Sequence, residues 1–344
     1  MASTKKRTKK ITVGRSLIYL VLVFVLGIIL LSIRKIPEKI EYGVSFSKFR
    51  AEELNLDWKK TYDAILNDLG VRKFRLVAHW PMIEPKESVF SFSELDYQMN
   101  KAREKNAPVI LAVGRRLPSW PECHEPEWAK NLSAEEKEKK IFRYVEAVVN
   151  RYKSYSNLKY WQVENEFFLG FFAKHHCEKE ADKLLASEDY IKREIDLVRR
   201  LDSTHPILLT DSGEFGRWYK PYQLGDIFGT SMYLYIWSHY FGPIRYPVPV
   251  SFFKIKQNLL DVFYENKPKI LIELSVEPWL LEPIVDSSFS ETRKVMNLER
   301  FKEIISFAKK SGFDTQYLWG AEWWYYEKIN GQSDFWEEGK KLFK

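Results

Sequence analysis

The chain has 344 residues, of which 45% are hydrophobic and 29% are charged, and its formal net charge is +7 at pH 7. The positive excess comes from the first 35 residues, which carry no acidic side chain and eight basic ones: Lys5, Lys6, Arg7, Lys9, Lys10, Arg15, Arg34 and Lys35. Subtracting these eight charges from +7 leaves about −1 for the rest of the chain, which excludes the basic footprint of a nucleic-acid-binding domain. The aromatic share of 16% fits either a large aromatic core or a cleft whose rings stack on sugar faces.

An uncharged apolar run, SLIYLVLVFVLGIILLSI, occupies residues 16–33. As a helix its 18 residues would extend about 27 Å, enough to cross the hydrocarbon core of a bilayer. A cleaved signal peptide is the alternative, but the run is long for a signal core and IRKIPEK follows it in place of a small-residue cleavage site. We therefore expect a basic cytoplasmic tail over residues 1–15, a transmembrane signal-anchor over 16–34 and a linker over 35–41. The positive-inside rule then places the body of the protein outside the cytoplasm, attached to the cell membrane by one span.

From residue 42 onward, a short apolar strand, a loop and an amphipathic helix alternate. Asp57 is a suitable N-cap for the first helix, which Gly70 ends, and Ser133 with Glu136 forms the capping box of a later helix. Two further helices are expected over Ser187–Leu201 and Phe252–Glu265. The predicted strands are Tyr42–Phe46, Lys73–Ala78, Val109–Val113, Lys159–Val163, Ile207–Thr210, Ile227–Met232, Lys269–Ile272 and Thr315–Trp319.

Eight strand–helix units in one run predict an α/β fold, a single (β/α)8 TIM barrel over residues 42–344. An open doubly wound sheet is the alternative. It would place a glycine-rich phosphate-binding turn after the first strand, where this chain has SFSKFRAEE.

Two carboxylates end predicted strands on roughly opposite sides of this barrel. Glu166 follows the fourth strand and Glu273 follows the seventh, and the active sites of such barrels lie at the carboxyl ends of the strands. Cleavage of a glycosidic bond needs one carboxyl group to protonate the leaving oxygen and another to attack or to activate water. A gap of about 5–5.5 Å between them would mean retention, and about 6.5–9.5 Å would mean inversion. Glu164 and Glu277 are close alternatives to Glu166 and Glu273.

The segments WQVENE and ILIEL resemble clan A of the glycoside hydrolases, barrels that include cellulase-like, β-galactosidase-like and β-xylanase-like enzymes. The resemblance covers residues 42 to about 324, and it departs from the clan at Phe167, where proline is frequent. It implies a retaining double displacement, with Glu166 as the acid/base and Glu273 as the nucleophile. Asn165 would hold the 2-hydroxyl of the sugar.

Four more positions are candidates for substrate binding. By the same resemblance, Arg75 matches the arginine near the nucleophile, Tyr233 the tyrosine that hydrogen-bonds it, and Trp319 the tryptophan under the sugar. Tyr235 is an alternative to Tyr233, since both point to one face. His79 either hydrogen-bonds a sugar or caps its strand. We expect no cofactor.

The two cysteines, Cys123 and Cys177, lie beside His124, His175 and His176. A disulfide is the simplest interpretation outside the cytosol, and free thiols are the next. A zinc site is a third, although the spacing within each group is tight for it.

The sequence therefore predicts a hydrolase of β-glycosidic bonds in extracytoplasmic poly- or oligosaccharides. A transglycosylase that uses the same two glutamates is one alternative. A sugar-binding barrel without turnover is another, although such a protein would not need both carboxylates.

Overall fold

The computed structural model describes residues 2–170, 180–238, 240–280 and 282–344. Its main strands are β1 Glu41–Ser45, β2 Phe74–Val77, β3 Val109–Val113, β4 Leu158–Val163, β5 Ile207–Asp211, β6 Ile227–Met232, β9 Lys269–Ser275 and β10 Thr315–Trp319. These strands pair in parallel and close into a barrel in the order β1-β10-β9-β6-β5-β4-β3-β2. The predicted (β/α)8 barrel is confirmed, and each predicted strand overlaps its observed counterpart.

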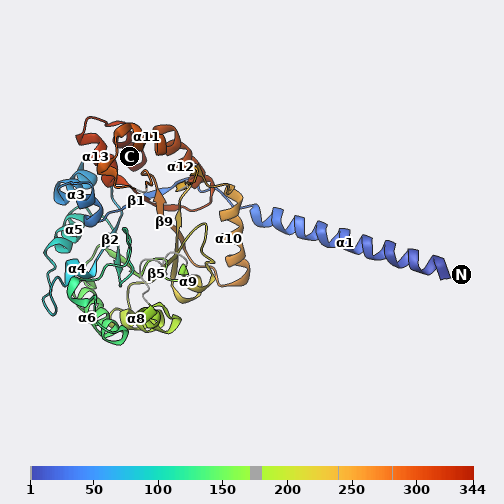
Figure 1. Cartoon of the computed structure of the whole chain (residues 1–344), viewed down its shortest axis with the longest axis horizontal. Coiled ribbons are helices and arrows are strands. Elements are labelled where there is room, and N and C mark those ends of the chain that lie inside the picture. The colour runs from blue at the N-terminus through green and yellow to red at the C-terminus, as the bar shows by residue number, and fades with distance from the viewer. Residues whose placement is uncertain (1, 171–179, 239, 281) are drawn as a thin grey trace.

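Helices surround the barrel between successive strands (Figure 1). The α-helices after β1 are α2 Lys48–Glu53, α3 Trp58–Asn67, α4 Trp80–Ile83, α5 Ser93–Glu104, α6 Ala134–Tyr152, α8 Glu188–Leu201, α9 Tyr219–Leu224, α10 Val250–Phe263, α11 Phe289–Val295, α12 Leu298–Lys310, α13 Ala321–Ile329 and α14 Asp334–Lys340. Short 3₁₀ turns are η1 Glu127–Ala129, η2 Glu180–Ala186, η3 Ile284–Asp286 and η4 Lys341–Phe343. A two-stranded hairpin that the sequence did not predict, β7 Tyr235–Ser238 with β8 Gly242–Arg245, lies between β6 and α10.

The predicted helix starts are confirmed by their caps. The Asp57 side chain accepts hydrogen bonds from two main-chain N–H groups in the first turn of α3. Ser133 and Glu136 form the predicted capping box at the start of α6, and Ser187 caps α8. Gly70 has a φ of +85° in the turn after α3, a conformation that glycine adopts at little cost.

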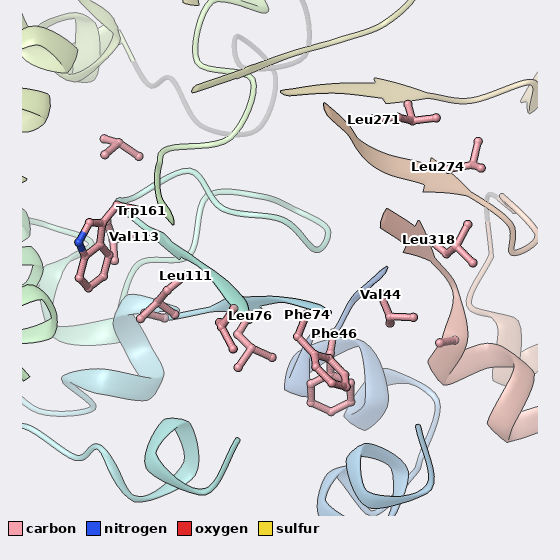
Figure 2. Packing of buried hydrophobic residues seen from close by; sticks show 14 of the residues in the cluster. Val44, Phe46, Phe74, Leu76, Leu111, Val113, Trp161, Leu271, Leu274 and Leu318 are labelled. Atoms are coloured by element: carbon pink, nitrogen blue, oxygen red, sulfur yellow. The ribbon is translucent and has the colours of Figure 1, made fainter. Parts of the chain in front are cut away.

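Side chains alternate between the two faces of each strand, and this alternation produces one apolar layer outside the barrel and another inside it. Outward side chains such as Phe74, Leu76 and Leu111 pack against the helices (Figure 2), while Ile110, Ile272 and their neighbours form a smaller cluster inside the barrel. Arg75 lies between Phe74 and Leu76 in β2, so it points into the barrel, as the period of two requires.

β9 is longer than predicted, and it carries an irregularity that matters for the site. The predicted strand ends at Ile272, but pairing with β6 continues to Leu274 and pairing with β10 continues to Ser275. The register with β6 shifts between Leu271 and Glu273, and Leu271 and Leu274 both belong to the outer layer. Because of this bulge, the two residues between them, Ile272 and Glu273, both lie on the inner side.

Helix α1, Ala2–Ser32, extends away from the barrel (Figure 1). Its large apolar side chains from Leu17 to Leu30 are 41–68% exposed. It joins α10 through Asn258, whose Nδ2 donates to the carbonyls of Leu31 and Ile33 at 2.8 Å each. In the part of the chain that the structure describes, no helix has the length and apolar character of a membrane span. The predicted helix over this run is confirmed, whereas its place in a membrane stays a prediction.

Candidate active site

Two of the predicted residues, Arg75 and Tyr233, contact Glu273. Arg75 on β2 donates from Nη1 to Glu273 Oε2 at 2.6 Å, and the Tyr233 hydroxyl, just after β6, donates to Oε1. The Arg75 side chain is fully buried and that of Glu273 is 11% exposed. Burial and the Glu273 carboxylate raise the pKa of Tyr233, so its hydroxyl keeps its proton and remains a donor. A cation and a hydroxyl donor therefore both contact the carboxyl group of Glu273.

Arg75 also connects β2 to β4. Its Nη2 donates to Asn165 Oδ1 at 2.7 Å and its Nε to Gln162 Oε1 at 2.8 Å. Asn165 Oδ1 accepts a further, longer bond of 3.3 Å from the Thr210 hydroxyl of β5. The planar guanidinium therefore fixes the amide of Asn165 relative to Glu273. Sequence reasoning missed Gln162, although a glutamine in an otherwise apolar strand is a signal of a buried polar network.

Glu166 has a different environment. Its main-chain N–H donates to Thr210 Oγ1 at 2.8 Å, and its φ of +46° lies in the left-handed region. Burial raises the pKa of Glu166 well above its usual range, and the nearby carboxylates of Glu122 and Glu273 raise it further. A hydrogen bond from the Ser231 hydroxyl opposes this shift. Glu166 thus holds a proton that a general acid can donate.

The rival glutamates are engaged elsewhere. Glu164 accepts hydrogen bonds from the main-chain N–H groups of Arg115 at 2.8 Å and Arg116 at 2.5 Å, which ties it to the loop after β3. Glu277 forms an ion pair with Arg50 at 2.9 Å and accepts the Trp319 indole N–H at 2.8 Å. These contacts favour Glu166 and Glu273 as the reacting pair.

The aromatic candidates have mixed surroundings. Trp319 ends β10, is 8% exposed and is oriented by its bond to Glu277. Tyr233 packs edge-on against Trp279, with ring centroids 5.0 Å apart; the sequence analysis did not single out Trp279. The Tyr235 hydroxyl bonds Glu303 instead of Glu273, so Tyr233 is the better candidate of the two.

His79 is only 1% exposed. Its Nε2 lies 2.9 Å from the Pro118 carbonyl, and its ring stacks on Phe49 at 4.3 Å. Burial lowers the pKa of His79 well below its usual range. These contacts fit support of the loop after β3, and a contact of His79 with sugar stays a prediction.

Cys123 is disulfide-bonded. Cys177, His175 and His176 lie outside the described residues, so the structure does not place the other half of the predicted cluster. His124 Nε2 lies 3.0 Å from the Ser119 carbonyl. Among the residues that the structure describes, no group of three or more His, Cys, Asp or Glu side chains could hold a metal ion.

The comparisons with known proteins bear on the fold and on the class of protein. The family model of glycosyl hydrolase family 10 matches residues 59–213, which is less than half of the chain. No curated protein matches the chain.

Among solved structures, xylanase 10B from Thermotoga petrophila RKU-1 in complex with xylobiose is 16% identical with a TM-score of 0.52, and the match covers 82% of each chain. The exo-β-1,4-mannosidase from Opitutaceae bacterium strain TAV5 is 14% identical with a TM-score of 0.57, over 88% of this chain and 59% of that one. The β-galactosidase from the Antarctic haloarchaeon Halorubrum lacusprofundi is 15% identical with a TM-score of 0.52. That match covers 81% of this chain but only 52% of the β-galactosidase chain, so this chain spans about half of that protein's length.

At these identities the structural likeness shows the fold. Together with the family match and the two glutamates at the strand ends, it confirms the resemblance to clan A glycoside hydrolases and supports a glycosidase.

Proposed function

We propose that the protein is a retaining glycosidase that cleaves β-glycosidic bonds by double displacement, with Glu166 as the acid/base and Glu273 as the nucleophile. The observation that carries the proposal is the contrast between the two carboxyl groups. Glu273 faces the Arg75 cation and the Tyr233 hydroxyl, whereas Glu166 faces other carboxylates. The surroundings of Glu273 thus suit a carboxylate that attacks, and those of Glu166 suit a carboxyl group that donates a proton.

In the first step, an oxygen of Glu273 forms a bond to the anomeric carbon while the bond from that carbon to the leaving oxygen breaks. The proton of Glu166 goes to the leaving oxygen. In the second step, Glu166 takes a proton from water, the water oxygen bonds to the anomeric carbon, and Glu273 leaves as a carboxylate. Arg75 and Tyr233 stabilise that carboxylate at both ends of the cycle.

Asn165 and Trp319 complete the site in this proposal. Asn165 is held by Arg75 on the same strand end as Glu166, a suitable position for bonding the 2-hydroxyl of the sugar. Trp319, fixed by Glu277, supplies a ring for the sugar face. A sugar-binding barrel without turnover has no need for the paired nucleophile and acid, which is why catalysis is the better explanation.

We further propose that residues 16–34 anchor the chain in the cell membrane and that the barrel acts outside the cytoplasm on poly- or oligosaccharides. Three observations support this. The apolar side chains of α1 are exposed, the eight basic residues of the first 35 flank them, and Cys123 is disulfide-bonded. Disulfides persist in oxidising compartments, outside the cytosol. Fractionation of cells that express the full chain would test it: release of the intact chain into the soluble fraction would contradict the anchor.

The test of the activity is a screen of aryl β-glycosides and cell-wall glycans with the full chain in detergent. We expect turnover of at least one substrate, and a loss of about 10³-fold or more in Glu166→Gln and Glu273→Gln, both of which should stay folded. Proton NMR of the first product should show the β-anomer, and first release of the α-anomer would refute retention. Transfer to an added alcohol in preference to water would instead indicate a transglycosylase.

A 2-deoxy-2-fluoro glycoside of the cleaved sugar separates an enzyme from a binding barrel. A retaining enzyme should be labelled covalently at Glu273, as peptide mass spectrometry would show. Binding of the unmodified sugar without labelling or turnover would support the non-catalytic alternative.

A further inference from the structure

We propose that Arg116 and Glu122 form a positioning pair that holds the catalytic segment 164–169 and thereby sets the orientation of Glu166. The proposal rests on the proposed role of Glu166 as the acid/base. The sequence places both residues in the loop after β3, away from the strand that carries Glu166, and gives neither of them a role.

Arg116 is bonded to the segment at four points. Its Nη1 donates to the carbonyl of Glu166 at 3.0 Å and to that of Leu169 at 3.3 Å. Its main-chain carbonyl accepts from the N–H of Asn165 at 2.7 Å, and its own N–H donates to Glu164 Oε2. One residue therefore holds both the start and the end of the turn that presents Glu166.

The segment needs such support. Glu164 has a φ of +57° and Glu166 a φ of +46°, in the left-handed region that residues other than glycine rarely adopt. A conformation of this kind persists where the surroundings over-determine it, and it occurs often at active sites. Without the bonds of Arg116, the segment would be free to relax, and the carboxyl group of Glu166 would lose its fixed direction.

Glu122 holds Arg116 in place. Its Oε2 accepts from Arg116 Nε at 2.7 Å, while Arg116 as a whole is only 5% exposed. A buried guanidinium needs a counter-charge, because an unpaired one is costly to bury. The loop folds back for this contact. Leu117 N–H donates to the Glu122 carbonyl, and Glu122 N–H donates to the Ser119 carbonyl. The main chain of Cys123 forms an isolated antiparallel β-bridge with that of Arg116.

The pair also changes the electrostatics at Glu166. Among the described residues, the charged or titratable groups that interact with Glu166 include Glu122, Glu273, Arg116 and Tyr233. Glu122 raises the pKa of Glu166 more than Glu273 does, and Arg116 lowers it. Glu122→Gln would remove a negative neighbour and leave the Arg116 charge unneutralised. Both changes should lower the pKa of Glu166, so the alkaline limb of the pH profile should move to lower pH.

The experiment compares Glu122→Gln with the full-length wild type on two aryl glycosides of the sugar that the screen identifies. A 4-methoxyphenolate leaves only with help from an acid, whereas 2,4-dinitrophenolate leaves without it. We expect kcat/KM to fall at least about 10-fold for the methoxyphenyl glycoside and less than about 3-fold for the dinitrophenyl one. The alkaline limb should shift down by about half a pH unit or more. Arg116→Lys, which keeps the charge but loses the forked geometry, should show the same leaving-group difference.

Glu125→Gln is the matched control. Glu125 pairs with Arg115 at 2.5 Å and with Lys137 at 2.9 Å, so the same charge is removed from the neighbouring ion pair of the same loop. It should show no difference between leaving groups. The ratio of the two rates does not depend on how much enzyme is folded, so partial unfolding would not imitate the result. An equal loss on both substrates, or an unshifted alkaline limb in Glu122→Gln, would overturn the proposal.

Failure of the proposed function can be told apart from failure of this inference. If no glycoside is cleaved, the proposed function fails. The pKa of Glu166 can still be measured by pH titration of the carbon-13 signal of its carboxyl group. That signal is assigned because it is absent from the spectrum of Glu166→Gln. A lower pKa of Glu166 in Glu122→Gln than in wild type would support the pair, and an unchanged one would overturn it.

Discussion

The Tyr233 hydroxyl is the contact at Glu273, the proposed nucleophile, that can be removed with the least disturbance. Tyr233→Phe keeps the ring and its packing against Trp279 while deleting the hydrogen bond to Glu273. In the proposed second step Glu273 leaves as a carboxylate, so a donor at its Oε1 would stabilise charge that develops in the transition state. A hydrogen bond to a charged group contributes about 1.5–3 kcal/mol, which corresponds to about 10- to 150-fold in rate.

Because the second step limits the turnover of reactive substrates, the effect should appear in kcat for a dinitrophenyl glycoside. We expect kcat to fall about 10- to 150-fold, with a burst of dinitrophenolate as the glycosyl-enzyme accumulates. Tyr235→Phe is a matched control, since it removes a hydroxyl bond to Glu303, two positions along the chain. The reasoning would be refuted by equal losses in the two variants, or by less than about a threefold change in Tyr233→Phe.

Three further predictions concern the supports of the site. Arg75→Met should lower the free energy of unfolding by about 3–5 kcal/mol in urea titrations, because it leaves Glu273 as an uncompensated buried charge; a loss under about 1 kcal/mol would contradict this. Burial raises the pKa of Glu322 to about 8, so its proton stabilises the folded state and this stability is lost as pH rises from about 4.5 through 8. Urea titrations at several pH values should show that the free energy of unfolding of the wild type falls by a few kcal/mol over this range, whereas that of Glu322→Gln does not. If the free energies of unfolding of the two proteins change with pH in parallel, the raised pKa of Glu322 is contradicted. Trp319→Ala should raise KM about 10-fold, measured by initial rates, whereas an unchanged KM would exclude Trp319 from the sugar face.

The barrel could be predicted from the sequence because local patterns decide it. The apolar strands of β3, β6 and β10 have the bounds that their sequences indicate, and the caps Asp57 and Ser187 begin the expected helices. Each depends on side chains within a few residues of the element. The glutamates at the ends of β4 and within β9 could be found because strand ends converge in this fold.

The parts that could not be predicted depend on contacts between distant segments. The bulge that turns Glu273 inward arises from the pairing of β9 with β6, and no local pattern marks it. Glu122 reaches Arg116 through a loop with residues of positive φ, including Glu122 itself at +68°. The packing of the His79 ring beside Phe49 and His124 likewise joins segments that are distant in the sequence.

In the proposed mechanism, the electrostatic arrangement would also explain how Glu166 can serve as both acid and base. Glu166 holds its proton in the free enzyme partly because ionised Glu273 repels its negative form. When Glu273 becomes an ester to the sugar, that repulsion disappears, while Arg116 continues to favour the ionised form of Glu166. The pKa of Glu166 therefore falls at the moment when the second step requires a base. Glu122 is not consumed in the reaction, so its repulsion persists through both steps and keeps that base basic enough to take a proton from water.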